Sequence, residues 1–278
     1  AGRRGRIMRT AVPRPARLKP LVDRRKGLAS ALEIVPAADV VSADDKPTFA
    51  LRRRRQSSMW LACQAAADGQ ADSVVSAGNT GALLAISMFA MRMLEGAHRP
   101  ALASFLPTSR GETLMLDLGA NVECDADNLA EFAVMGSVFA QVLLGLDAPK
   151  VGLLNVGSEE LKGHEELRQA AAWLRRAGAP VNFHGFVEGD DIGAGVVDVV
   201  VTDGFTGNIA LKSIEGTARL YAGWVRDAFR TSTFAKVGYL FASGAWVKLR
   251  KRVDPRRYNG GVFLGLDGVC VKSHGGTD

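Results

Sequence analysis

Short apolar runs that each lead into a glycine-containing polar loop, and then into a helix-like stretch, recur along the chain. The runs begin ADSVVSAGNTG, TLMLDLGANVECD, VGLLNVGSEELKG and VDVVVTDGFTGN. Their apolar residues do not alternate with polar ones, which is typical of strands buried on both faces of a parallel sheet. Repeated strand–helix units of this kind predict an α/β fold, three-layer α/β/α with a mostly parallel sheet.

The positive charge of the chain is concentrated at its N-terminus. Residues 1–30 hold ten Lys or Arg and one acidic residue, Asp23, whereas the whole chain holds 35 Lys or Arg and 29 Asp or Glu. The remainder is therefore slightly acidic, which argues against a nucleic-acid-binding face. Residues 1–30 show no periodicity and contain Pro13, Pro15 and Pro20, so they predict a basic, disordered arm that does not supply a strand.

Residues 31–278 are predicted to form the α/β domain. Within it, Ser57 is placed to cap a helix through MWLACQAAADG that ends at Gly69. Residues 231–260 break the strand–helix rhythm, because they are first aromatic and apolar and then strongly basic. They predict a protruding segment.

Membrane-spanning and disulfide-based architectures are not supported by the sequence. No stretch reaches the roughly 18 uninterrupted apolar residues of a spanning helix, and the basic N-terminus lacks the apolar core of a secretory signal. Cys63, Cys124 and Cys270 lie far apart with no CxxC pair, which argues against a disulfide framework or a zinc ribbon. We expect a cytoplasmic protein with unpaired core thiols.

The loops that follow the apolar runs are the candidate site, because such loops meet at one edge of an open parallel sheet. They are residues 76–81 (SAGNTG), 117–125 (DLGANVECD), 155–163 (NVGSEELKG) and 202–208 (TDGFTGN). Glycine exposes backbone N–H groups, and the following helix N-terminus favours an anion such as phosphate. For any one loop alone, ordinary strand-to-helix turn chemistry is the alternative. The candidate phosphate- and substrate-binding residues are Ser76, Gly78, Asn79, Thr80, Gly81, Asp117, Asn121, Asn155, Asp203, Gly204 and Gly207.

Several common chemistries lack their motifs here. The chain has no GxGxxG, no GxxxxGK[ST] and no GxSxG, so a dinucleotide site, a P-loop and a serine nucleophile elbow are unsupported. The four histidines fit no metal-ligand spacing, and we expect no metal and no cofactor. Only His274, in KSHGG, has a functional setting.

Longer motifs then resemble one family. In order and spacing, eight motifs resemble those of the PlsX phosphate acyltransferases. They are DDKPTFALRRRRQSSM at residues 44–59, SAGNTGALLA, LDLGANVECDADNLAEFAVMGSVFA, VGLLNVGSEELKG, GFVEGDDI, VDVVVTDGFTGNIALKSIEG, DPRRYNGG and DGVCVKSHG. The resemblance covers residues 31–275. It implies a homodimeric enzyme, related in fold to isocitrate and isopropylmalate dehydrogenases and to phosphotransacetylase, that needs no cofactor.

The resemblance also implies the reaction and the partners. The family moves a fatty acyl group from acyl carrier protein to inorganic phosphate, and the acyl phosphate feeds a downstream membrane glycerol-phosphate acyltransferase in phospholipid synthesis. Its members associate peripherally with the membrane surface. Two alternatives stay open: phosphotransacetylase-like transfer from a coenzyme A thioester, and a non-catalytic remnant. The second arises because the family's first strand with its glycine turn, and its last helix, have no counterpart here, so that the domain looks truncated at both ends.

The residue types suit this reaction on chemical grounds. A thiolate leaves readily, so the site needs anion binding and oxyanion stabilisation rather than a covalent nucleophile. Lys162 and Lys212 are candidates to neutralise phosphate, although a solvated helix face is the alternative for both. Asn208 or His274 is placed to donate to the carbonyl oxygen, and His274 to protonate the thiolate. Asp117 and Asp203 end their strands and are candidates to orient these donors.

An apolar sequence beside a basic one provides the candidate membrane contact. It lies at residues 238–252, and an apolar segment next to a basic cluster is typical of an interfacial anchor for anionic lipid. Packing at a dimer interface is the alternative. The candidate membrane residues are Leu240, Phe241, Trp246, Lys248 and Arg250.

Overall fold

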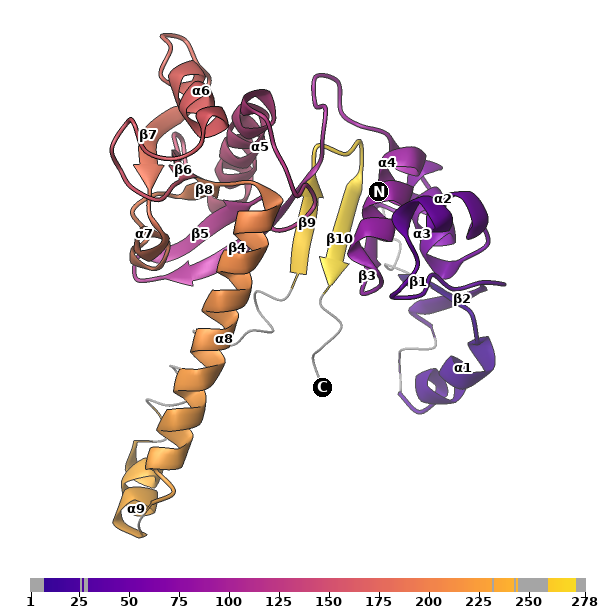
Figure 1. The fold of residues 1–278 in the computed structure, drawn as a ribbon. Coiled ribbons are helices and arrows are strands. Elements are labelled where there is room, and N and C mark those ends of the chain that lie inside the picture. The colour runs from indigo at the N-terminus through magenta and orange to yellow at the C-terminus, as the bar shows by residue number, and fades with distance from the viewer. Residues whose placement is uncertain are drawn as a thin grey trace. The chain divides into compact units, whose positions relative to one another are not determined.

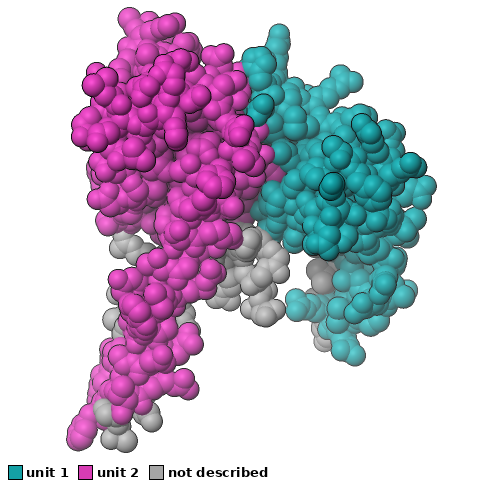
Figure 2. All heavy atoms as spheres, viewed as in Figure 1, with its two compact units in different colours: residues 1–100, 265–278 teal, residues 101–264 magenta. Residues whose placement is uncertain are grey.

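The chain folds into two compact units, which are described separately. The computed structural model describes residues 8–25, 27, 30–231, 233–242, 244 and 260–273. One unit comprises residues 1–100 with 265–278, and the other comprises residues 101–264 (Figure 2). The sequence predicts one domain over residues 31–278. The chain instead returns to its first unit after the strand that ends at Leu264.

The described residues of the first unit form four helices and two pairs of parallel strands. Its elements are β1 (Met8–Val12), α1 (Pro15–Asp23), β2 (Leu32–Pro36), α2 (Pro47–Arg53), α3 (Ser58–Ala67), β3 (Ser73–Ser76), α4 (Thr80–Met91) and β10 (Val269–Ser273). β1 pairs with β2, and β10 pairs with β3. Ser57 caps α3 as the sequence predicts, since its side chain accepts a hydrogen bond from the Trp60 N–H at 3.2 Å.

The structure corrects the prediction of a disordered N-terminal arm. Within residues 8–25, where the sequence predicts disorder, the chain forms β1 and α1. Pro13 and Pro15 follow β1 rather than interrupting it, and Pro15 stands at the start of α1, where its missing N–H costs no helical hydrogen bond. The pairing partner of β1 begins at Leu32, beyond the arm, so the arm's own composition does not reveal it.

The second unit has a six-strand arrangement with helices between its strands. Its elements are β4 (Ala101–Thr108), β5 (Gly111–Leu116), α5 (Ala126–Leu144), β6 (Lys150–Leu154), α6 (Glu165–Leu174), β7 (Asn182–Val187), α7 (Gly189–Ala194), β8 (Val199–Val201), α8 (Gly204–Ala228), α9 (Thr233–Phe241) and β9 (Gly260–Leu264). The strand order is β9-β4-β5-β8-β6-β7. β5, β8, β6 and β7 run parallel, whereas β4 is antiparallel to both of its neighbours. The expected α/β fold with a mostly parallel sheet is confirmed.

The core of this unit forms where α5 packs on the parallel strands. Leu129, Phe132 and Ala133 of α5 are buried together with Leu116 of β5 and Val199 of β8. By length and composition alone, α5 is apolar enough to span a membrane. Since its buried face belongs to this core, we interpret α5 as a core helix.

β5, β8 and β6 end at the same edge because they are parallel and adjacent. Residues 117–125, 202–208 and 155–163 follow these three strands. The folding of this unit therefore places three of the four loops that we singled out in the sequence at one edge.

The helix α8 extends well beyond the strands. With 25 residues it is about 37 Å long, and Figure 1 shows it running away from the strands of its unit with α9 at its far end. Only its first turn is buried, at Gly204 and Gly207. The described part of the expected protruding segment is α9; residues 245–259 lie outside the described residues.

Cys63 and Cys270 lie in the interior of the first unit, and Cys124 is partly exposed in the second. Burial raises the pKa of Cys63 to about 12 and that of Cys270 to about 11. Both thiols therefore keep their protons at neutral pH, and reagents attack the thiolate. Since an unfolded thiol has a pKa near 9.0, these two groups lower the stability of the fold as pH rises from there toward 11.

We predict that the native protein at pH 8 exposes only Cys124 to dithionitrobenzoate, because the other thiols are buried and protonated. Absorbance of the released thionitrobenzoate should report one fast thiol, and two more after addition of denaturant. Cys124→Ser should remove the fast phase and leave the slow ones. Equal rates for all three thiols in the folded protein would contradict this assignment.

Candidate active site

The buried carboxylate of Asp117 organises the edge of the second unit. Asp117 directly follows β5, is fully buried, and accepts five hydrogen bonds. Its Oδ1 accepts from the N–H groups of Leu102 at 2.9 Å, Gly119 at 3.2 Å and Ala120 at 3.0 Å. Its Oδ2 accepts from the backbone N–H of Asn121 at 2.7 Å and from Asn121 Nδ2 at 2.8 Å. Asp117 therefore shapes the loop that follows β5 and also fixes the start of β4.

All five partners are N–H donors, which match the ionised form of the carboxyl group. Burial raises the pKa of Asp117, and the hydrogen bonds from Ala120, Leu102 and Asn121 lower it in turn. With its side chain wholly inside the protein, Asp117 can orient the loop but cannot contact a ligand. This geometry suits the orienting role that the sequence indicates for it, and not direct phosphate binding.

The start of α8 packs directly on this loop. The Gly204 N–H donates to the Asn121 carbonyl at 2.7 Å. A Cβ at Gly207 would lie 1.9 Å from the Asp117 carbonyl oxygen, and one at Gly204 would lie 2.5 Å from the Asn121 oxygen. Only glycine lets the helix backbone approach this closely, so these two glycines serve helix packing.

Asp203 caps α8, because its side chain accepts from the Thr206 N–H at 2.8 Å and from the Thr206 hydroxyl at 2.7 Å. The next exposed polar side chain along α8 is Asn208, whose Cβ lies 3.5 Å from the position of a Cβ at Gly119. An exposed amide beside a helix N-terminus can donate to an oxyanion.

The two candidate lysines are both exposed and lie on different elements, one on a helix and one in a loop. Lys212 lies one turn after Asn208 on α8, and its Nζ is 3.2 Å from the Glu215 carboxylate. Lys162 lies near the end of the loop after β6, and its carbonyl accepts from Asn155 Nδ2 at 3.1 Å. Asn155 thus braces its own loop, and its Oδ1 also accepts from the Val156 N–H at 2.8 Å.

The loop at residues 76–81 belongs to the first unit and is built around Asn79. Asn79 Oδ1 accepts from the Ala82 N–H at 3.0 Å and so caps α4. Asn79 Nδ2 donates to backbone carbonyls of the loop before α2, at 2.9 Å to Ala43 and 3.0 Å to Asp45. Ser76 Oγ accepts from the Gly78 N–H at 3.2 Å, which tightens the turn.

The structure brings some of the predicted site residues together and leaves others apart. At the edge of the second unit, hydrogen bonds and close packing bring together Asp117, Asn121, Asp203, Gly204 and Gly207, and Asn208 lies beside Gly119 of the same loop. Asn155 and Lys162 share the loop after β6 at that edge, whereas Ser76, Gly78, Asn79, Thr80 and Gly81 lie in the first unit. His274 lies outside the described residues, as do Trp246, Lys248 and Arg250; Leu240 lies in α9, and Phe241, which ends α9, is exposed.

The sequence analysis missed two sets of hydrogen-bond partners that shape the candidate loops. The Leu102 N–H comes from β4, a strand that the strand–helix pattern does not reveal. The loop before α2 supplies the acceptors for Asn79, although the motif DDKPTFALRRRRQSSM begins inside that loop and carried a signal. Within the described part of the chain, no three His, Cys, Asp or Glu side chains are grouped as a metal site.

Comparison with known proteins gives close sequence relatives. The family model described as "Fatty acid synthesis protein" matches residues 10–278. A phosphate acyltransferase from Rhodospirillum centenum is 62% identical over 262 residues, covering 94% of this chain and 74% of that protein. A phosphate acyltransferase from Paramagnetospirillum magneticum is 56% identical over 263 residues, covering 95% of this chain and 75% of that protein.

Solved structures show the same fold at low sequence identity. A phosphotransacetylase from Streptococcus pyogenes aligns with a TM-score of 0.59 and 15% identity, covering 98% of this chain and 89% of that one. The EutD phosphotransacetylase from Staphylococcus aureus aligns with a TM-score of 0.53 and 15% identity, covering 99% and 90%.

We predict that Gly207→Ala destabilises the protein by about 1–3 kcal/mol, because its methyl group would overlap the Asp117 carbonyl. Urea unfolding measures the change. The matched control is Gly216→Ala on the same helix, where nothing lies within 4 Å of the added Cβ. That variant should gain roughly 0.5–1 kcal/mol from helix propensity. Equal stability of the two variants would contradict the close approach of α8 to the loop.

Proposed function

This chain belongs to the PlsX phosphate acyltransferase family, and we propose that it transfers a fatty acyl group from acyl carrier protein to inorganic phosphate. The observation that carries the proposal is the identity of 53–62% to phosphate acyltransferases over about 95% of the chain. The product, acyl phosphate, would serve phospholipid synthesis through a downstream glycerol-phosphate acyltransferase. The phosphotransacetylase folds support the architecture alone, and the kinship with isocitrate and isopropylmalate dehydrogenases rests on the sequence resemblance.

The proposed reaction is an acyl transfer without net oxidation. A phosphate oxygen attacks the thioester carbonyl carbon and forms the new C–O bond, and the carbonyl oxygen carries the developing negative charge. The C–S bond then breaks, and the sulfur leaves as a thiolate that takes up a proton. The chemistry needs neither a nucleotide nor a redox cofactor, because no electrons are exchanged and no anhydride is consumed.

Two kinds of group would serve this reaction. In each unit separately, at residues 76–81 and at the start of α8, we assign anion binding to backbone N–H groups other than those of Gly78, Gly204, Thr206 and Gly207, which donate within the fold. The helix N-terminus at each place adds a favourable dipole. Lys162 and Lys212 are exposed cations that we assign to charge neutralisation. We assign oxyanion stabilisation to Asn208, and protonation of the thiolate to His274.

We predict that the purified protein forms acyl phosphate from acyl carrier protein thioester and phosphate, which hydroxylamine traps as a hydroxamate. Asn208→Ala should lower kcat by about 10²-fold, because the oxyanion loses a donor. Ser213→Ala, an exposed neighbour on the same helix, should behave like the wild type.

The nature of the thioester and of the co-reactants decides between the alternatives. A preference for acyl-coenzyme A over acyl carrier protein would favour the phosphotransacetylase-like reading. Strict dependence on NAD or ATP would contradict the proposed reaction.

We also propose that the protein is a homodimer. The outer part of α8 carries large apolar side chains that are half or more exposed, at Leu220, Tyr221 and Trp224. Tyr221 and Trp224 stack edge to face at 5.3 Å, which presents a continuous aromatic surface. An exposed surface of this kind marks an interaction site more often than a bare face of a monomer.

A peripheral, cytoplasmic membrane association is the remaining part of the proposal. Phe234 and Phe241 of α9 are each 89% exposed, and Trp246, Lys248 and Arg250 follow in the sequence. Exposed apolar side chains next to cations suit the boundary of an anionic bilayer.

We predict that the double variant Phe241→Asp with Trp246→Asp no longer floats with vesicles that contain phosphatidylglycerol, because two charges would enter the apolar boundary. Val142→Asp places a charge on another exposed apolar residue, on α5, and should float like the wild type. Size-exclusion chromatography tests the alternative role of this segment. Loss of the dimer with unchanged flotation would assign these residues to a subunit interface.

A further inference from the structure

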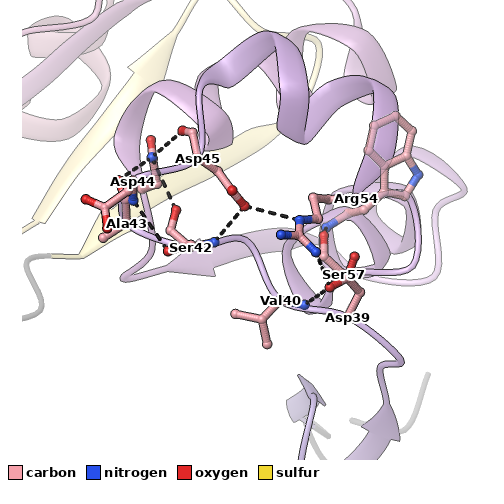
Figure 3. A network of polar contacts seen from close by, with 10 residues as sticks. Asp39, Val40, Ser42, Ala43, Asp44, Asp45, Arg54 and Ser57 are labelled. Atoms are coloured by element: carbon pink, nitrogen blue, oxygen red, sulfur yellow. Dashed lines mark hydrogen bonds and ion pairs between the residues drawn. The ribbon is translucent and has the colours of Figure 1, made fainter.

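A single arginine joins the two ends of the loop before α2. Arg54 Nη1 lies 2.8 Å from Asp39 Oδ1, and Arg54 Nε lies 3.2 Å from Asp45 Oδ2 (Figure 3). The guanidinium also stacks over the Phe49 ring, 5.2 Å from its centroid. Asp39 and Asp45 are six positions apart, so one planar cation closes residues 39–45 into a ring.

This ring is tied on its inside as well. Asp45 Oδ2 accepts from the Ser42 N–H at 2.9 Å, as Figure 3 shows. The Ser42 N–H, and after it the Arg54 guanidinium, lower the pKa of Asp45. The backbone of Asp39 is joined to the start of α3, since its carbonyl accepts from the Ser58 N–H at 3.2 Å. The ring therefore has a defined shape rather than that of an open surface loop.

Three backbone carbonyl groups of the ring contact one side chain, that of Asn79. The carbonyls of Ser42, Ala43 and Asp45 accept from Asn79 Nδ2 at 3.4, 2.9 and 3.0 Å. Asn79 is also the cap of α4 and the central residue of the loop at residues 76–81. Arg54 is thus linked to Asn79 through its ion pair with Asp45, the hydrogen bond from the Ser42 N–H to that carboxylate, and the backbone carbonyls that the Asn79 amide contacts.

We propose that Arg54 is a positioning residue for the phosphate-binding loop at residues 76–81. Arg54 touches no substrate; it holds the three carbonyls in the arrangement that orients the Asn79 amide. Asn79 in turn accepts from the Ala82 N–H at the start of α4 and so fixes the end of its loop. The inference rests on the proposed assignment of phosphate binding to this loop.

Arginine is required here for a geometric reason. Its planar fork presents separate N–H groups to two carboxylates at once, whereas a lysine ammonium is a point charge on a flexible stem. Lysine at this position would keep the charge and lose the bridge between Asp39 and Asp45. A conservative replacement therefore separates the positioning role from a simple need for positive charge.

The chain provides a matched control next to this residue. Arg54 is one of four consecutive arginines, at residues 52–55. Arg53 ends α2 and is exposed, and in the described part of the chain it has no ion-pair partner. Arg53→Ala removes the same side chain from the same basic cluster without touching the ring.

The experiment measures kcat and the KM for phosphate and for the acyl thioester in Arg54→Ala, Arg54→Lys, Arg53→Ala, Asn79→Ala and the double variant Arg54→Ala with Asn79→Ala. Circular dichroism gives the folded fraction of each. Arg54→Ala should raise the KM for phosphate roughly tenfold, as removal of an outer group that orients a binding group typically does, and leave the KM for the thioester unchanged. Arg54→Lys should show most of this defect, and Arg53→Ala none. The double variant should be no worse than Asn79→Ala, because both changes act through the same amide.

Each contrary outcome has one meaning. A wild-type KM for phosphate in Arg54→Lys, losses in Arg54→Ala that follow only its folded fraction, or additive effects in the double variant would overturn the positioning role. If Arg54→Ala does not fold, the comparison of Arg54→Lys with Arg53→Ala decides the question. If Asn79→Ala itself leaves the KM for phosphate unchanged, the proposed binding loop fails, and the inference about Arg54 fails with it.

Discussion

The buried carboxylate of Asp117 is the interaction on which the edge of the second unit depends. It gathers N–H groups from the start of β4, from the loop after β5 and from the side chain of Asn121. A buried carboxylate is costly unless its oxygens are fully hydrogen-bonded, and here five donors meet that requirement. The loop conformation and the hydrogen-bonded carboxyl group therefore stabilise each other, and loss of either would expose unpaired groups in the interior.

The position of α8 follows from that loop. The Asn121 carbonyl receives the Gly204 N–H, and Gly207 leaves the space that the Asp117 backbone occupies. α8 consequently begins in contact with the loop and can present Asn208 and Lys212 near the sheet edge. The same helix carries Tyr221 and Trp224 at its outer part. One rigid element thus connects the proposed chemistry with the surfaces that we propose for assembly.

The two units use the same principle with different groups. In the second unit a buried anion collects backbone N–H groups, and in the first a partly buried arginine collects two carboxylates whose loop presents carbonyl groups to Asn79. In both units the organising residue, Asp117 or Arg54, does not itself contact the ligand in our proposal. Other residues of the loop that it shapes do so. The exposed groups that would bind a ligand are therefore positioned by buried or partly buried residues, whose hydrogen bonds are less open to competition from water.

The sequence by itself determined the class of fold, the cap of α3 and the family. Short apolar runs such as VVV at residues 199–201 indicate strands buried on both faces, and Ser57 predicts the start of α3, because burial and capping depend on residues that are close in the chain. The motifs also singled out the loops in which Asp117, Asn79 and Asn208 lie. What only the tertiary structure decided are the pairings between distant residues. Leu102 meets Asp117 across 15 positions, and Asn79 meets Ser42 across 37. β1 exists because β2 pairs with it, and Arg54 differs from Arg53 because two aspartates lie beside it. Local pattern records propensity and burial, whereas the partner of a polar group is set only when the folded backbone brings the two together.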